Sequence, residues 1–171
     1  MIAAWWRNWK RRRRLEGLIR QAASPEAGQR RQAATDLAEF RDDRAAAALV
    51  QLLNDSHPPV REAASASLRS LGPVALDALL AGLNRADGDV AVASAGLLAD
   101  LADPAAIGPL VVALKFSARP VQLAAKRALI RLGPPAAQAL WAEADDPQPW
   151  VRQQVADVLE QVAAARPHSG G

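Results

Sequence analysis

The sequence has no cysteine and no tyrosine, only two histidines, and few aromatic residues (five Trp and two Phe in 171). The absence of cysteine excludes disulfides, thiolate nucleophiles and cysteine-based zinc sites, and it fits a reducing compartment. The histidines and acids show no spacing typical of metal ligands, and the glycines form no phosphate-binding loop. We therefore predict no cofactor, no metal and no catalytic residues, so that the protein is not an enzyme.

Long uncharged segments are also missing. The longest, residues 104–114 and 132–142, have eleven residues each, whereas a transmembrane helix needs about 20. The apolar run at residues 2–6 is too short for a signal peptide, and positive charges follow it instead of preceding it. These absences favour a cytoplasmic protein, with membrane association limited to a peripheral surface.

One tripeptide contains the residue types of a hydrolytic triad. Asp55, Ser56 and His57 are adjacent in the chain, and neighbours on a loop cannot take up the geometry of nucleophile, base and orienting acid. We interpret this tripeptide as a turn at a helix end.

The positive charge is concentrated at the start of the chain. Residues 1–14 contain six cations and no acid, and the remaining 15 basic and 18 acidic residues give the body a net charge of −3. A basic segment attached to a mildly acidic body indicates that the two parts bind different things.

The body is an internal repeat. Five segments begin at Gln29, Val60, Val90, Val121 and Val151, at intervals of 30 or 31 residues. Each has a leucine eight positions later: Leu37, Leu68, Leu98, Leu129 and Leu159. The apolar positions within a segment fall on one side of a helix, so each segment predicts one buried stripe.

A second helix precedes each of these segments. It carries a leucine followed by another apolar residue, at Leu18, Leu49, Leu79, Leu110 and Leu140. Gly72-Pro73 and Gly133-Pro134 are typical of a helix end followed by a helix start. Since no alternating pattern of strands competes, we predict ten short helices in five pairs, the first beginning at Leu15.

The residues of these repeats resemble a known family. The segment 60–64 (Val-Arg-Glu-Ala-Ala), followed by Leu68, Leu71 and Gly72, is similar to the short HEAT-like repeats of the phycobilin-lyase type. The resemblance covers about residues 15–164 and implies an all-α fold, a right-handed α-solenoid of five HEAT-like helical hairpins. It also implies pairing between an Asp and an Arg six residues later, as in Asp55 with Arg61 and Asp146 with Arg152.

The N-terminal segment carries a tryptophan stripe. Trp5, Trp6 and Trp9 share one helix face, which points well away from that of Leu15 and Leu18. Either the tryptophan face is therefore spare, or the chain breaks between the two sets. Tryptophan among cations suits an anionic membrane surface, and the same residues suit an acidic partner, single-stranded nucleic acid or a cap over the first repeat. The candidate residues for a membrane or acidic partner are Trp5, Trp6, Trp9, Arg7, Lys10, Arg11, Arg12, Arg13 and Arg14.

A second candidate surface lies on the later repeats. The positions opposite the buried stripe of the third and fourth repeats are mostly apolar, which predicts an exposed patch for a protein partner. Its residues are Val92, Ala95, Ala99, Leu123, Lys126 and Ile130. We interpret Trp141, at a position that is apolar in every repeat, as core or end cap, and Trp150 as covering the last edge.

These observations predict a basic Trp-rich segment at residues 1–14, a HEAT-like repeat domain at 15–164 and a disordered tail at 165–171. The predicted function is a non-catalytic scaffold or adaptor that binds proteins, attached to a membrane surface or an acidic partner by its N-terminus. The alternatives are a nucleic-acid-binding module that uses the N-terminal Trp/Arg segment, and a bilin-lyase-like protein that handles a chromophore.

Overall fold

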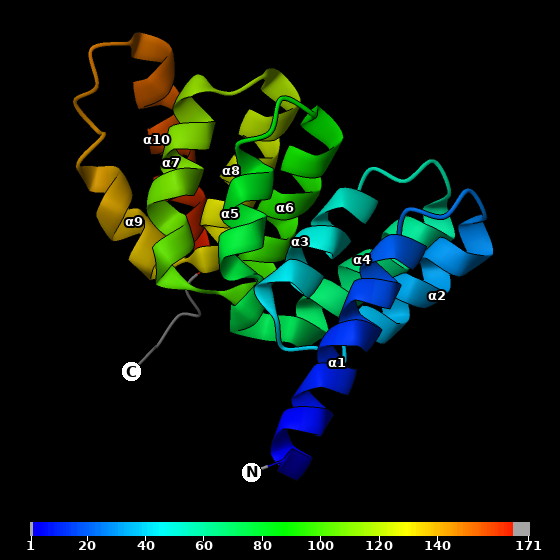
Figure 1. The fold of residues 1–171 in the computed structure, drawn as a ribbon. Helices are drawn as coiled ribbons and strands as arrows, with labels where there is room; N and C mark the ends of the chain where they lie inside the picture. Colours follow the sequence, from blue (N-terminus) through cyan, green and yellow to red (C-terminus); the bar gives the residue numbers. More distant parts are fainter. Residues whose placement is uncertain (1, 166–171) are drawn as a thin grey trace. The chain divides into compact units, whose positions relative to one another are not determined.

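The computed structural model describes residues 2–165, and every regular element in that range is a helix (Figure 1). The predicted tail at 165–171, with His168, lies almost entirely outside the described residues. The α-helices are α1 (Ile2–Gln21), α2 (Ala27–Leu37), α3 (Asp43–Leu52), α4 (Pro58–Leu71), α5 (Leu76–Leu83), α6 (Gly88–Leu101), α7 (Ile107–Phe116), α8 (Arg119–Leu132), α9 (Pro134–Trp141) and α10 (Pro149–Ala164). Two short 3-10 turns, Gly72–Ala75 and Pro104–Ala106, precede α5 and α7.

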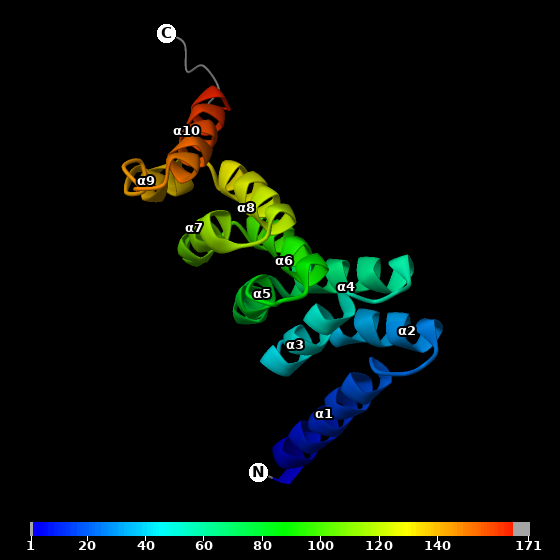
Figure 2. The ribbon, with the colours of Figure 1, turned by 90° about the horizontal axis from the view of Figure 1, so that it is seen from above.

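The chain divides into two compact units, Met1–Leu79 and Leu80–Gly171, with the boundary inside α5. In the first unit α2 and α3 pack against α4, and α1 packs against α2 and α3. Figure 2 shows α1 and α3 in one layer and α2 and α4 in the other. The leucines predicted to form the core, Leu37, Leu49 and Leu68, are fully buried between these layers.

The second unit repeats this arrangement. Helix α8 is its centre and contacts α6, α7, α9 and α10. Helices α7 and α9 lie in one layer, and α6, α8 and α10 in the other (Figure 2). Leu98, Leu110, Leu129 and Leu140 are fully buried. The all-α fold of stacked helical hairpins is thus confirmed, with one local shift: in α10 Val158 is fully buried and Leu159 only half-buried.

The backbone has a positive φ at three positions that are equivalent in the repeat. Gly72 and Gly133 have φ of +59° and +69°, and Ala102, at the same place in the repeat between them, has φ of +54°. Glycine adopts positive φ without the Cβ clash that other residues suffer. The predicted helix ends at both Gly-Pro pairs are confirmed, since Gly72 and Gly133 terminate α4 and α8.

Helix α1 runs unbroken from Ile2 to Gln21. Position 14, where we expected the basic segment to end and the repeat domain to begin, therefore lies inside one helix. Of the two alternatives for the N-terminus, the structure contains the unbroken helix with a spare tryptophan face.

One described segment, Pro58–Leu83, is long and apolar enough by length and composition to cross a membrane, and 39% of the relevant window is buried. It is not one straight helix, because the positive φ of Gly72 and the following 3-10 turn separate α4 from α5. Its apolar residues Val60, Leu68 and Leu79 are buried. We therefore assign the segment to the core of the repeats.

Candidate functional site

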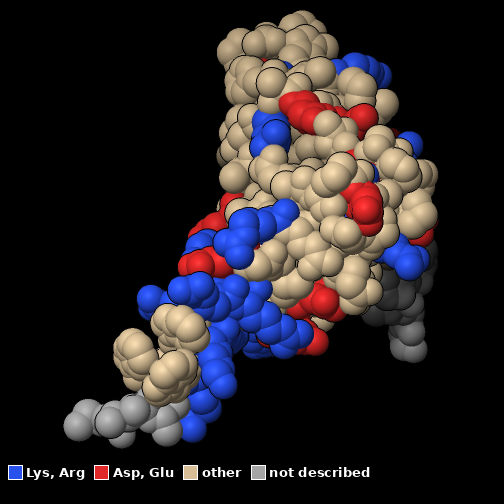
Figure 3. Space-filling model, turned by 45° about the vertical axis from the view of Figure 1, so that its right-hand side comes forward, with Lys and Arg blue, Asp and Glu red and all other residues tan. Residues whose placement is uncertain are grey.

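The first candidate site is the outward side of α1. Trp5, Trp6 and Trp9 have exposed fractions of 62%, 47% and 39%. Their rings contact each other edge to face, with centroids 5.8 Å apart for Trp5 and Trp6 and 5.2 Å for Trp6 and Trp9. The Arg13 guanidinium lies over the Trp9 ring, 4.9 Å from its centroid, within the range of a cation–π interaction. Figure 3 shows a group of uncharged side chains (tan) next to blue cations towards the lower left of the molecule.

The interpretation of the three tryptophans as a cap over the first repeat is wrong. At about 100° per residue, they lie on the side of α1 opposite to Leu15 and Leu18, which are buried against the rest of the unit. A helix without a break cannot turn both sets towards one core.

The cations of α1 divide between its two sides. Arg13 belongs to the tryptophan side, whereas Arg11 and Arg14 lie over the ring of Phe40 at 5.8 Å and 5.6 Å from its centroid. Arg14 also forms an exposed ion pair with Glu39, at 3.0 Å. The six cations therefore do not act as a single group around the tryptophans.

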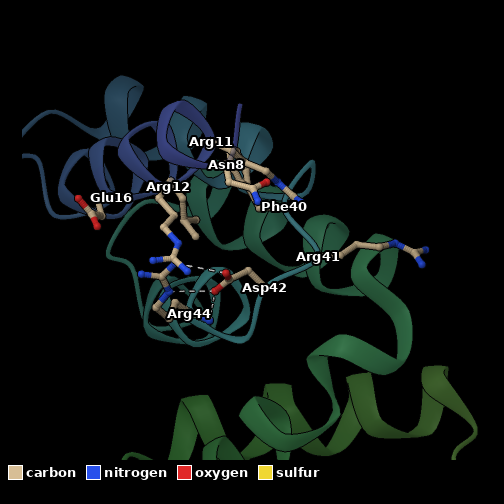
Figure 4. A pocket seen from close by; sticks show the side chains of 9 residues that line it. Asn8, Arg11, Arg12, Glu16, Phe40, Arg41, Asp42 and Arg44 are labelled. Atoms are coloured by element: carbon tan, nitrogen blue, oxygen red, sulfur yellow. Dashed lines mark hydrogen bonds and ion pairs between the residues drawn. The ribbon is translucent and has the colours of Figure 1, made fainter. Parts of the chain in front are cut away.

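A pocket of about 360 Å³ lies between α1 and the start of α3. Residues of α1 that follow one another at intervals of three or four form one wall, and the segment from Phe40 to Arg44 forms the other (Figure 4). Its lining residues are Asn8, Arg11, Arg12, Leu15, Glu16, Phe40, Arg41, Asp42 and Arg44. No sequence pattern marked this pocket, because it forms only when the N-terminal half of α1 lies beside the loop before α3.

Charges inside the pocket are partly paired. Asp42 caps α3 by accepting from the Arg44 backbone N–H at 3.0 Å, and it also accepts from the Arg44 guanidinium at 3.1 Å and 3.3 Å. These bonds hold the pKa of Asp42 below its ordinary value, the side-chain bond from Arg44 being the largest cause and the charge of Arg11 a smaller one. Among the described residues, no carboxylate forms an ion pair with Arg11 or Arg12.

The predicted protein-binding patch on α6 and α8 is only partly exposed. Ala95 and Ala99 are buried, so their assignment to a partner surface is wrong: α6 packs closely along α8, and small side chains at these positions lie inside that packing. Leu123 is exposed, and Val92 and Ile130 are half-buried.

Lys126, the one charged residue predicted for this patch, is engaged within the second unit. Its Nζ lies 2.8 Å from Oδ2 of Asp157, and only 16% of the lysine side chain is exposed. This ion pair links α8 to α10 and lowers the pKa of Asp157. Leu123 is thus the most accessible residue of the predicted patch.

The second unit exposes other apolar side chains that sequence reasoning missed. Phe116 and Trp141 have exposed fractions of 68% and 67%, and Val112 is also exposed. The core interpretation of Trp141 is therefore wrong, although Val111 at the same repeat position is buried. A clue existed for Phe116, because the equivalent positions in the other repeats, Ser24, Asp55, Arg85 and Asp146, are all polar.

Trp150, expected to cover the last edge, lies at the start of α10 with 40% of its surface exposed. Its Nε1–H donates to Oε1 of Gln148 at 2.6 Å. The ring is therefore held beside its own loop and leaves much of its face open.

The loops before α4 and α10 are held by ion pairs that join successive repeats. In the first unit Arg30 donates two hydrogen bonds to Asp55, at 2.5 Å and 2.8 Å, which lowers the pKa of Asp55. In the second unit Lys115 bonds Asp146 at 2.6 Å and Glu143 at 2.5 Å, and the pKa of Asp146 is lowered chiefly by the Lys115 bond.

The Asp–Arg pairing expected within one repeat takes a different form. Arg61 and Arg152 donate to the backbone carbonyls of Asp55 and Asp146, at 2.7 Å and 2.8 Å. Since the carboxylates accept from other cations, the partner of each arginine is main-chain oxygen. These contacts stabilise loops.

The triad-like residues do not form a catalytic relay. Ser56 Oγ lies 3.0 Å and Asp55 Oδ1 3.6 Å from the same nitrogen, Nδ1 of His57. A relay uses both ring nitrogens, one for the nucleophile and one for the orienting acid. Within residues 2–165, no group of three or more His, Cys, Asp or Glu is placed to hold a metal ion.

Among proteins of curated function, none matches the chain. Solved structures that are similar include the complex of CpcE and CpcF of phycocyanin lyase from Nostoc sp. PCC7120, with 25% identity and a TM-score of 0.48. That match covers 88% of this chain and 65% of the lyase chain, so this chain spans less than two thirds of that relative. Human deoxyhypusine hydroxylase is 18% identical, with a TM-score of 0.41 over 88% of this chain and 84% of the enzyme. A designed armadillo repeat protein in complex with the peptide (KR)4 is also 18% identical, with a TM-score of 0.40 over 86% and 81%.

The model of HEAT repeats matches residues 15–95 and 76–160, which together span most of the chain and coincide with the repeats that the leucine spacing predicted. On this evidence the chain belongs to the HEAT repeat family.

Proposed function

We propose that the protein is a non-catalytic scaffold that binds other proteins and attaches to an anionic membrane surface through α1. The repeat fold supports the first part, because stacked helical hairpins offer extended surfaces and need no catalytic centre. The observation that carries the second part is the cluster of three exposed tryptophans on the side of α1 that faces away from the core.

The chemistry of this side suits the boundary between water and lipid. Indole rings favour the headgroup level of a bilayer, where their apolar body and polar N–H are both accommodated. Arg13, stacked on Trp9, places a cation at the same level, and each cation near an anionic surface contributes about 1 kcal/mol. Arg11 and Arg14 lie on Phe40, on the other side of the helix. We therefore expect the three tryptophans to account for more of the affinity for an anionic membrane, and the cations of α1 for less, than the total positive charge suggests.

Co-sedimentation of the full chain with vesicles tests this attachment. The vesicles contain phosphatidylcholine alone or phosphatidylcholine with phosphatidylserine. The triple variant Trp5→Ala, Trp6→Ala, Trp9→Ala should lose at least about tenfold in affinity for the anionic vesicles, equivalent to about 1.4 kcal/mol.

A matched control is available in the second unit. Val112→Ala, Phe116→Ala, Trp141→Ala also removes three large exposed apolar side chains and should bind the vesicles like the unaltered protein. Equal loss in both variants, or no loss in the tryptophan variant, would contradict attachment through α1. Tighter binding to single-stranded RNA, falling steeply with salt, would favour the nucleic-acid alternative.

For the partner of the repeats, Leu123 is the accessible residue to alter. Val92 and Ile130 lie half-buried on the same pair of helices, so a charge at Leu123 disturbs this surface with little effect on the core. Affinity capture with Leu123→Asp should lose partners that the unaltered protein retains, whereas Arg127→Asp, four positions further along α8 and also exposed, is the control.

A further inference from the structure

The pocket between α1 and the start of α3 holds positive charge that the protein does not neutralise. Of its carboxylates, Asp42 is bonded to Arg44, and the charge of Glu16 also acts on Arg44. The nearby Glu39 pairs with Arg14. Arg11 and Arg12 both line the pocket, and among the described residues neither has a carboxylate in ion-pair contact.

We propose that this pocket, the α1 arginine pocket, binds a phosphate group, carried either by a lipid headgroup or by a small soluble phosphate. In its lipid form the proposal rests on the membrane attachment proposed above. Guanidinium groups bind phosphate oxygens through paired, charge-assisted N–H bonds. Phosphate has enough oxygens and charge to accept from more than one of the arginines that line the pocket, Arg11 and Arg12 among them, and the Asn8 amide in the same wall offers a further N–H donor.

Apolar residues that line the pocket help to hold the Arg11 side chain in place before a ligand binds. Leu15 and Phe40 are buried and apolar, and the Arg11 guanidinium lies over the Phe40 ring at 5.8 Å from its centroid. A side chain held against a ring loses less conformational entropy when a ligand binds. In Figure 4 Arg11, Arg12 and Arg44 border the pocket, while Arg41 extends away from the other lining side chains, so we assign no role to it.

The same helix supplies a control that removes equal charge. Arg7 and Arg20 are exposed residues of α1 that do not line the pocket. The pair Arg11→Gln, Arg12→Gln therefore removes two charges from the pocket, and the pair Arg7→Gln, Arg20→Gln removes two from elsewhere on α1. All four side chains are exposed, so we expect both variants to fold, which thermal melts can verify.

The test has a soluble arm and a lipid arm, both with the full chain. In the soluble arm, calorimetric titration with inorganic pyrophosphate should show binding that Arg11→Gln, Arg12→Gln weakens about tenfold or more, while Arg7→Gln, Arg20→Gln changes it by less than about threefold. In the lipid arm, vesicles containing phosphatidylinositol phosphate should bind more tightly than phosphatidylserine vesicles of equal charge. That preference should disappear in Arg11→Gln, Arg12→Gln.

The outcomes separate this proposal from membrane attachment. Pyrophosphate binding without vesicle binding supports the pocket with a soluble phosphate and defeats membrane attachment. Vesicle binding that depends on Trp5, Trp6 and Trp9, with no pyrophosphate binding and no preference among lipids, supports attachment and overturns the pocket. Equal losses in the two arginine variants also overturn it, since the effect would then be one of net charge. Preferential binding of single-stranded RNA through Arg11 and Arg12 would overturn a headgroup or small phosphate as the ligand.

Discussion

The two compact units are built from the same repeat but expose different chemistry. Residues 1–79 contain thirteen basic and nine acidic residues, and residues 80–171 contain eight and nine. Among the described residues, the large exposed apolar side chains of the first unit all lie on α1, surrounded by cations. Those of the second unit are spread over α7, α8, α9 and α10: Val112, Phe116, Leu123, Trp141 and Trp150.

This difference shows where a repeat protein keeps its specificity. The buried stripe is alike in both units because every hairpin must cover its neighbour. Exposed positions carry no such constraint, so one unit presents tryptophan with arginine and the other presents scattered apolar side chains. Substitutions at equivalent positions should therefore have like effects in the two units where the side chain is buried, and different effects where it is exposed.

The largest effect is expected at the repeated leucine. Leu37 in the first unit and Leu129 in the second are fully buried at the same repeat position, so Leu37→Ala and Leu129→Ala should each lower the free energy of unfolding by about 2–5 kcal/mol. Urea unfolding followed by circular dichroism measures this. A loss below about 1 kcal/mol at either position would show that the units are not packed alike.

The next effect concerns the turn that ends α4 and α8. Gly72→Ala and Gly133→Ala should each cost about 1–3 kcal/mol, because alanine is strained at positive φ. No atom lies within 4 Å of an added Cβ at either position, so the cost is that of backbone conformation alone. At the equivalent Ala102 (φ +54°) the reverse change, Ala102→Gly, should raise stability by about 0.5–1 kcal/mol. In thermal melts the melting temperature should therefore fall for Gly72→Ala and Gly133→Ala and rise for Ala102→Gly. A higher melting temperature for Gly72→Ala would contradict the strain that we assign to alanine at positive φ.

A smaller effect is expected at the loop ion pairs. Asp55→Asn should cost about 1–2 kcal/mol at neutral pH, because it weakens two charge-assisted bonds from Arg30. Asp146→Asn should cost less, since Lys115 keeps its bond to Glu143. The native pKa of Asp55 is lowered, so the stabilisation is present above the ordinary aspartate pKa of about 3.9 and is lost as pH falls through the lower native value.

Unfolding measured from neutral to acidic pH tests this dependence. The difference in stability between the unaltered protein and Asp55→Asn should shrink below about pH 4. A difference that stays constant with pH would mean that the carboxylate charge does not stabilise the loop.

The smallest effect on stability is expected where the units differ most. Phe116→Ser and Trp141→Ser should each change the free energy of unfolding by no more than about 0.5 kcal/mol, because both side chains are largely exposed. Together they should reduce binding of a hydrophobic dye to the native protein. A large loss of stability would place these side chains in the core, as the pattern of the repeat suggested for Trp141.

Several features could be predicted from the sequence because they depend on spacing along one chain. The leucine period located the buried residues Leu37, Leu68, Leu98 and Leu129 and the helix that carries each of them. The Gly-Pro pairs located two helix ends, since positive φ and a missing N–H are properties of single residues. In α10 the period also located the buried residues Val151, Val155 and Val162, but Leu159 is half-buried and its neighbour Val158 is fully buried instead.

The exposed and binding features depended on neighbours in space, and here sequence reasoning was weaker. Ala95 and Ala99 were placed on a partner surface, yet the contact of α6 with α8 buries them. Trp141 was interpreted from its register as core or end cap, yet nothing among the described residues covers most of it.

The repeat fold follows from the spacing of apolar residues along the chain, because burial of one apolar stripe per helix needs only a repeated spacing. The sequence also placed the tryptophans and cations at the N-terminus. The packing of the helices was needed to show that α1 continues without a break, that it turns Trp5, Trp6 and Trp9 outward, and that Arg11 and Arg12 line a pocket with the loop before α3. The exposure of a side chain and the electrostatic potential around it depend on which groups, distant in sequence, lie next to it.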